Sequence, residues 1–147
     1  MKVSRRRLPA IAAGVVGLGA ALAFALPAGA AVSTQSAPAG VLALGANATL
    51  DANGAVVFAP VKVGCRPGST ASLAVTVTEN VNDVIASGTY YGNVTCDGGQ
   101  QKLRVAVVPT QRAFKKGVAF GQATLMVCGD SGCQGFADQH SIQIVKK

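Results

Sequence analysis

The sequence is poor in the residues on which catalysis usually depends. It contains one histidine and only six acidic residues among 147. A Ser-His-acid triad would have to use His140, and Ser131 and Asp138 are close to it in sequence. Serine and aspartate in turns usually shape the backbone instead. We therefore expect no catalytic residues and do not expect an enzyme.

The sequence also lacks the spacing of known metal and carboxylate sites. No pair of acidic residues lies in the apolar context that glycoside hydrolysis needs. Cys128 and Cys133 have no CxxC spacing and no set of histidines nearby, which argues against a zinc or redox site. We expect no metal ion and no cofactor.

Much of the positive charge lies in the first thirty residues. Lys2 and Arg5-Arg6-Arg7 precede an apolar stretch, Leu8 to Leu26, and Ala28-Gly29-Ala30 supplies small residues for cleavage. This pattern predicts a signal peptide at residues 1–30 and a secreted protein, either free or associated with the cell wall. The alternative is an uncleaved membrane anchor, because the apolar stretch approaches a spanning length. The three arginines also fit twin-arginine export.

Removal of this leader changes what the net charge means. Four of the 13 Lys and Arg residues lie in the leader, so nine remain against six Asp and Glu, a net charge of +3. The remaining basic residues are scattered and do not alternate with aromatic residues, as they would in a nucleic-acid interface. We expect no nucleic-acid partner, membrane contact only through the leader before cleavage, and a monomer.

Four cysteines predict two disulfides in an exported chain. Four cysteines allow three pairings. Cys128 and Cys133 are separated by four residues where two expected strands meet, so a local bond closes easily. Cys65 then pairs with Cys96, and the bond lies across or beside the core.

The rest of the chain has the two-residue period of β-strands and no helical period. Residues 31–42 are expected to be a flexible lead-in and residues 43–147 a single β domain. Alternation of apolar and polar residues is clearest at residues 71–78, 102–107 and 119–127. The sequence predicts an all-β fold, an immunoglobulin-like antiparallel β-sandwich of about seven strands with two disulfides. A small closed barrel is the alternative.

Several turns and irregularities are also predicted. Asn53-Gly54 indicates a two-residue hairpin turn. Pro60 indicates a sheet edge or a crossover between sheets, because proline has no N–H to donate. Gly88 and Gly92 indicate a bulge or bend in one strand. The last strand is expected at residues 141–145, with a loop from Cys133 onward.

Three aromatic residues are candidates for binding. Tyr90 and Tyr91 are adjacent on a glycine-flanked strand, so alternation sends one ring inward and one outward. Phe136 lies in the expected loop beyond Cys133, where its ring would cap the end of the sandwich or line a cleft.

The segment Cys128-Gly129-Asp130-Ser131-Gly132-Cys133-Gln134 resembles the neocarzinostatin family. These small exported actinobacterial proteins have an immunoglobulin-like fold, hold an enediyne chromophore in a cleft, and also end a late strand in a C-x4-C loop. The family's other disulfide closes a short loop, whereas Cys65 and Cys96 are far apart. No pocket residue is therefore carried over from the family.

Together these patterns predict a secreted, non-enzymatic module, binding or structural, whose ligand is unknown and would be a small molecule or a cell-wall component. One alternative, implied by the resemblance, is a small-molecule carrier, which needs an apolar cleft between the sheets. A second is an exported protease inhibitor that presents Arg112 in the loop Thr110 to Ala113.

Overall fold

A computed structural model describes residues 39–147 of this chain. The predicted signal peptide, its twin-arginine motif and most of the predicted lead-in lie outside the described residues. The described part contains eight strands: β1 (Gly40–Leu44), β2 (Asn47–Asp51), β3 (Val56–Cys65), β4 (Thr70–Val81), β5 (Val84–Thr95), β6 (Gln100–Val107), β7 (Gly117–Gly129) and β8 (Gly132–Lys146). A short 3-10 turn, η1 (Ala52–Gly54), separates β2 from β3. Because β1 begins at Gly40, the domain starts before the predicted boundary at residue 43.

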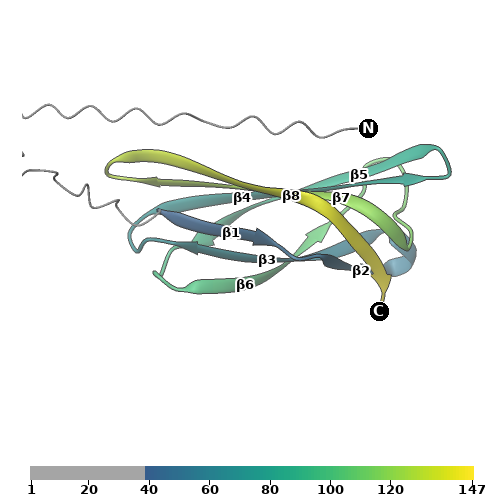
Figure 1. Cartoon of the computed structure of the whole chain (residues 1–147), viewed down its shortest axis with the longest axis horizontal. Helices are drawn as coiled ribbons and strands as arrows, with labels where there is room; N and C mark the ends of the chain where they lie inside the picture. The colour runs from purple at the N-terminus through teal and green to yellow at the C-terminus, as the bar shows by residue number, and fades with distance from the viewer. Residues whose placement is uncertain (1–38) are drawn as a thin grey trace, which may run out of the picture. The chain divides into compact units, whose positions relative to one another are not determined.

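The strands form two packed layers (Figure 1). The larger sheet has the order β5-β4-β7-β8, and each neighbouring pair is antiparallel. In the smaller sheet, β3 pairs with β6 on one side and with β1 and β2 on the other. β2 also pairs in parallel with β8, which joins the two sheets along one edge. This arrangement confirms the predicted immunoglobulin-like sandwich.

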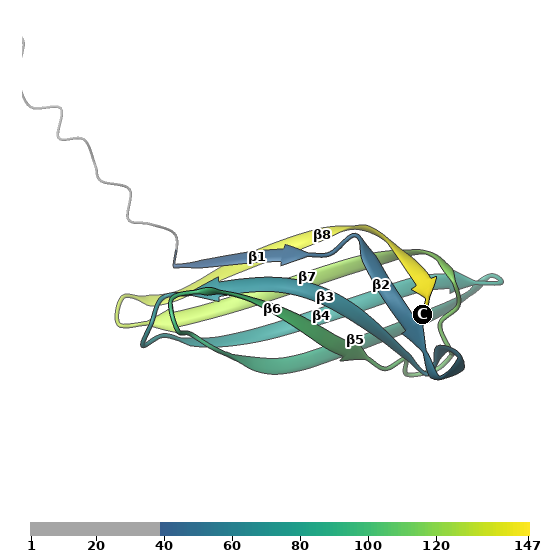
Figure 2. The ribbon, with the colours of Figure 1, turned by 90° about the horizontal axis from the view of Figure 1, so that it is seen from below.

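The count of eight strands results from an interruption opposite Pro60. β1 and β2 follow each other along the same side of β3, with a bend between them (Figure 2). At the bend, the Gly45 N–H donates to the Pro60 carbonyl (2.8 Å). Pro60 cannot donate a ladder bond in return, so the neighbouring strand breaks while β3 continues. The predicted sheet edge or crossover at Pro60 was therefore wrong.

The core between the layers consists of branched aliphatic side chains. Alternation over residues 71–78 correctly predicts that β4 buries Ala71, Leu73, Val75 and Val77, and the strand also buries Glu79 and Val81. β7 buries its odd-numbered positions from 119 to 127. The largest fully buried side chains are Val57, Val61, Val63, Leu73, Val75, Val77, Val107, Phe114, Leu125, Val127, Ile142 and Ile144. These side chains remove the apolar face of each sheet from water, which is the main driving force for a sandwich of this kind.

The predicted bulge in β5 is absent. β4 and β5 pair without interruption from Thr70 opposite Thr95 to Val81 opposite Val84. The two glycines are needed for close approach instead. A Cβ at Gly88 would collide with the carbonyl of Val108, and one at Gly92 would collide with the hydroxyl of Tyr90.

The closing hairpin is longer than the sequence predicts. β8 starts at Gly132 and pairs with β7 in one continuous register, from Gly129 opposite Gly132 to Gly117 opposite Ile144. The loop expected beyond Cys133 was therefore wrong, and Phe136 lies in a strand. The Asn53-Gly54 hairpin is also longer than two residues, because η1 and Ala55 separate β2 from β3.

Both predicted disulfides are present. Cys65, at the end of β3, is bonded to Cys96, which follows β5, so this bond links the smaller sheet to the larger one. Cys128 and Cys133 are bonded directly across the β7–β8 ladder, beside the turn at the hairpin tip.

Candidate functional site

The outer face of the larger sheet carries no charged side chain. We call this surface the neutral face, and it is formed by the outward-facing residues of its four strands. They are Ile85, Ser87, Thr89, Tyr91 and Asn93 of β5; Ser72, Ala74, Thr76, Thr78 and Asn80 of β4; Val118, Phe120, Gln122, Thr124 and Met126 of β7; and Gly135, Ala137, Gln139, Ser141, Gln143 and Val145 of β8. The burial of the alternate residues on these strands fixes which side chains point outward.

The same face holds most of the exposed large apolar side chains. Six of the nine such residues in the described chain lie on it: Ile85, Tyr91, Val118, Phe120, Met126 and Val145. Single exposed apolar residues are ordinary, but their concentration on one uncharged face is not. This combination is typical of a contact surface.

A groove crosses one half of the neutral face. It has a volume of about 660 Å³ and is lined by three adjacent positions on each of β4, β5, β7 and β8. Small outward residues, including Ala74, Gly135 and Ala137, form its floor. Tyr91 and Met126, which are 78% and 47% exposed, rise beside it. The groove is therefore shallow, mainly apolar and open to solvent.

Paired hydroxyl groups stiffen the other half of this face. Thr76 and Thr89 lie opposite each other on β4 and β5, with their hydroxyl oxygens 2.9 Å apart. Thr78 and Ser87 form the next pair, at 3.1 Å. Each of these hydroxyl groups thus makes one hydrogen bond within the sheet, without a water molecule or a ligand.

The outer face of the smaller sheet has the opposite character. Lys62 and Lys102 lie directly across from each other on β3 and β6, and Arg104 follows two residues later on the same face. The Arg104 guanidinium lies 4.2 Å from the centroid of the Phe58 ring, a cation–π contact. The cations of the sandwich faces are therefore confined to one sheet.

The candidate aromatic residues are divided between the core and the surface. Tyr90 faces inward and packs against the buried cluster, whereas Tyr91 faces outward, as the alternation predicts. The Phe136 ring packs against the core beside β1, where a Cβ at Gly40 would touch it at 3.0 Å. Among the three, Tyr91 is thus the one that offers its ring to a ligand.

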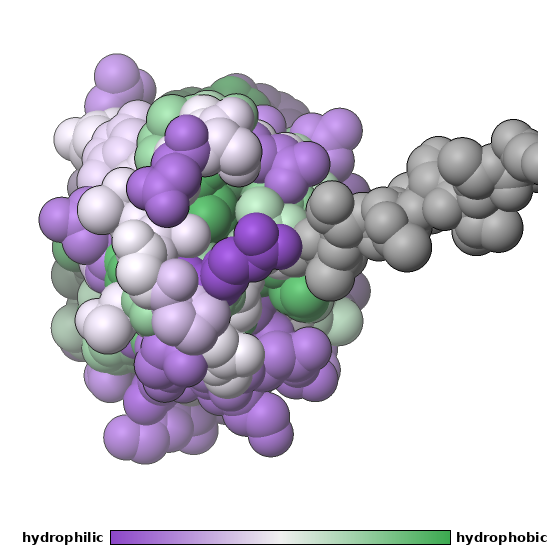
Figure 3. All heavy atoms as spheres, turned by 90° about the vertical axis from the view of Figure 1, so that its left-hand side faces the viewer, coloured by the Kyte–Doolittle hydropathy of each residue, from purple (hydrophilic) through white to green (hydrophobic). Residues whose placement is uncertain are grey.

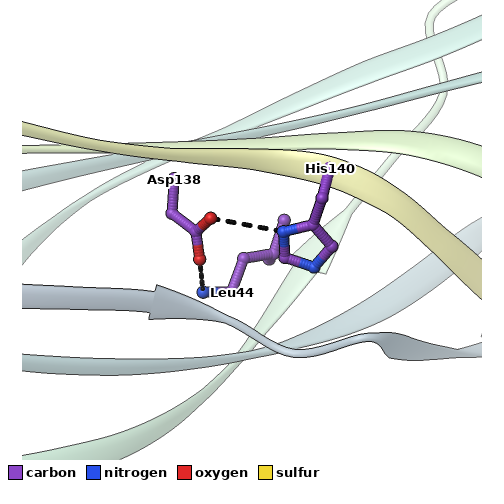
Figure 4. A network of polar contacts seen from close by, with 3 residues as sticks. All are labelled: Leu44, Asp138 and His140. Carbon is purple, nitrogen blue, oxygen red and sulfur yellow. Dashed lines mark hydrogen bonds and ion pairs between the residues drawn. The ribbon is translucent and has the colours of Figure 1, made fainter. Parts of the chain in front are cut away.

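Asp138 and His140 form a structural pair at the seam between β1 and β8 (Figure 4). One carboxylate oxygen of Asp138 accepts the Leu44 N–H at 2.7 Å, and the other lies 3.2 Å from His140 Nδ1. The Leu44 N–H, and to a lesser degree His140, lower the pKa of Asp138. Ser131 lies in the turn at the far end of the hairpin, so the residues considered for a triad are not assembled.

The end of the sandwich near this turn is mainly hydrophilic (Figure 3). A hollow of about 610 Å³ lies there between the residue 66–69 turn and the Cys128–Cys133 tip. Residues 39–147 contain no group of three or more His, Cys, Asp or Glu side chains suited to hold a metal ion. The described part also has no helix long and apolar enough to cross a membrane.

Arg112, the residue considered for protease inhibition, points back to the protein. Its guanidinium donates to the Val81 carbonyl at 3.1 Å. The neighbouring Lys115 N–H donates at 2.8 Å to the carboxylate of Glu79, a buried acidic residue whose role the sequence did not indicate. Arg112 is thus an exposed residue whose guanidinium is anchored to β4.

Fold and surface together define a disulfide-stapled immunoglobulin-like sandwich with one uncharged outer face. Neither a protein-family model nor a curated protein matches the chain. Among solved structures, the chain is similar to AggA, the major subunit of aggregative adherence fimbriae type I from Escherichia coli. The identity is 12%, the match covers 74% of this chain and 94% of that chain, and the TM-score is 0.34. At this similarity the comparison carries no inference about function.

Proposed function

We propose that this protein is an exported, non-enzymatic module that acts through surface contacts, and that the neutral face is its contact surface. The observation that carries the proposal is the separation of charge between the two sheets. The neutral face has apolar side chains and uncharged hydrogen-bonding groups, while Lys62, Lys102 and Arg104 lie on the opposite side. Cores of protein interfaces are similarly depleted in Lys, Glu and Asp and enriched in aromatic residues and Met.

Export is supported by the two disulfides and by the sequence pattern of the leader. Structural disulfides persist in oxidising compartments and are rare where thiols are kept reduced. The bond between Cys65 and Cys96 links the two sheets and so has a structural role that suits such a compartment. Secretion or attachment to the cell wall is tested by fractionation of the producing cells.

The most informative test is native mass spectrometry of the protein isolated from its own host. We expect a bound species that is lost when Thr124→Lys places a charge in the groove. Ala106→Lys is the matched control, because Ala106 is exposed on the outer face of the smaller sheet. Loss of the bound species in the control but not in Thr124→Lys would show that the contact surface lies elsewhere.

The non-enzymatic part is tested separately with a panel of hydrolase substrates. We expect no turnover above the level of a protein-free sample. Turnover that disappears in His140→Ala would contradict this part of the proposal, because it would show that the Asp138–His140 pair has a catalytic role.

A second candidate function is that of a small-molecule carrier, a role similar to that of the chromophore-binding proteins. The groove favours it, because its volume of about 660 Å³ is in the range of small-molecule sites and its lining is mainly apolar. It lies on the outside of the larger sheet, however, and not between the sheets as the sequence led us to expect. An organic adduct in the native mass spectrum that is absent from Thr124→Lys would support the carrier.

A further inference from the structure

A protruding ring and a hollow lie on opposite sides of one residue of β7. Phe120, which is 46% exposed, precedes Gln122 by two residues, and Thr124, in the groove, follows Gln122 by two. Val118 and Met126 are the next outward residues in each direction. The outward side of β7 thus places a knob and a recess at equal distances from Gln122.

A surface of this kind can meet a copy of itself. In a two-fold symmetric interface the same patch is used twice, so a residue i that contacts j is matched by a j that contacts i. A charged side chain near the axis would face its own copy, and the neutral face has none. The other outer face carries Lys62, Lys102 and Arg104 and would repel a second copy.

We propose that two copies of the chain pair through their neutral faces, about a two-fold axis that crosses the strands at Gln122. The proposal rests on the proposed function, because it names the occupant of the same contact surface. This axis reverses positions along β7, so Phe120 of each copy lies over Thr124 of the other. Each ring then enters the groove between Tyr91 and Met126.

The available area fits a stable pair. Four strands about 4.8 Å apart, each contributing about ten residues at about 3.3 Å, present a face of roughly 20 by 30 Å. Pairing would bury about 600 Å² on each copy and about 1,200 Å² in total, which is at the lower limit of specific interfaces. The dimer is thus expected to be specific but reversible.

A second copy also accounts for more of the face than a small ligand does. A molecule in the groove would cover Tyr91 and Met126 but would leave Ile85, Val118 and Val145 exposed to water. A paired sheet extends over the whole face and covers these side chains as well. We therefore assign the face to a second copy, whereas the sequence alone led us to expect a monomer.

Sedimentation equilibrium of the chain without the predicted leader, residues 31–147, tests the pairing. Phe120→Lys and Thr124→Asp should each raise the dimer dissociation constant at least about 30-fold, because a charge would be buried without a partner. The double variant F120K/T124D should recover most of this loss, since each new lysine would face the new aspartate of the other copy. Within one chain these positions lie about 13 Å apart and pair poorly.

Two controls keep the result interpretable. Ala106→Lys adds the same charge on the smaller sheet and should leave the dissociation constant unchanged. Val118→Lys with Met126→Asp repeats the charge-pair design at the next positions from Gln122, in case one of the first variants does not fold. Thermal melts identify any variant that fails for that reason.

A wild-type chain that stays monomeric at every concentration measured would overturn the proposal. The proposal would also be overturned if neither double variant recovered dimerisation. The same holds if Ala106→Lys raised the dimer dissociation constant as much as Phe120→Lys. A monomer that loses another bound species in Thr124→Lys would also overturn the pairing, but it would leave the proposed function standing.

Discussion

The two disulfides should contribute unequally to stability. Cys65 and Cys96 are 31 residues apart in sequence, and Cys128 and Cys133 are 5 apart. In the chain-entropy model, closing loops of these lengths stabilises the fold by about 3.7 and about 2.1 kcal/mol. Structure reinforces the difference, because the first bond joins the two sheets while the second joins residues that the β7–β8 ladder already holds together.

The assay is urea unfolding of two double variants, Cys65→Ser with Cys96→Ser and Cys128→Ser with Cys133→Ser. The first should lose several kcal/mol, a large part of the roughly 5–15 kcal/mol available to a domain, and part of that loss comes from burying serine at position 65. The second should keep the fold and change mainly the hairpin tip. A larger loss for the second variant would refute this reasoning, because it would show that the tip bond holds the β7–β8 hairpin on the sandwich.

Three further predictions concern single side chains. Tyr90→Ala should lower the free energy of unfolding by about 2 kcal/mol or more because its ring packs on the core, whereas Tyr91→Ala should change it by less than about 0.5 kcal/mol; chemical denaturation of both separates them. Asp138→Asn keeps an acceptor for the Leu44 N–H but removes the titration. Since the folded-state pKa of Asp138 is lowered, its extra stability should be present above about pH 4 and disappear as pH falls further, so the wild-type and variant stabilities should converge in acid melts. Gly88→Val should destabilise markedly in thermal melts, because the new side chain would collide with the Val108 carbonyl.

The fold could be predicted where one face of a strand is exposed to solvent and the other is buried. β4 shows this best, since Leu73, Val75 and Val77 alternate with polar residues and are all buried. The disulfide pairing followed from spacing, because only a hairpin brings Cys128 and Cys133 together so easily. Neither conclusion required knowledge of how distant strands meet.

The errors arose where partners distant in sequence decide the local structure. The first half of β8 contains glycine and polar residues and has little strand pattern of its own, but the regular β7 strand provides its partners from Cys133 to Phe136 and beyond. Gly88 and Gly92 indicated a bulge because the sequence does not show that Val108 and the Tyr90 ring approach them. Local propensity is commonly overridden by such contacts.

The neutral face left a signal in the sequence that becomes clear only when the strands are aligned. The outward positions of β4 and β7 are Ser, Ala, Thr, Asn, Val, Phe, Gln and Met, without a single charge, but each strand alone resembles an ordinary strand with one solvent-exposed face. Only the register of four strands shows that these positions form one surface. From the sequence, one ring of the pair Tyr90 and Tyr91 was expected on the surface, and the structure shows that it is Tyr91.

Association of this sandwich is restricted in other directions, which gives the neutral face its significance. Sheet edges are the usual sites of unwanted strand pairing, and charged residues or a covering loop protect them. β6 is an edge strand with Lys102 and Arg104, while the edge of β5 is partly covered where Ser87 accepts the Thr110 N–H at 2.9 Å. The edges at β6 and β5 are protected in these ways and the outer face of the smaller sheet is basic, whereas the neutral face offers a second copy a broad surface with neither like charge nor a covering loop.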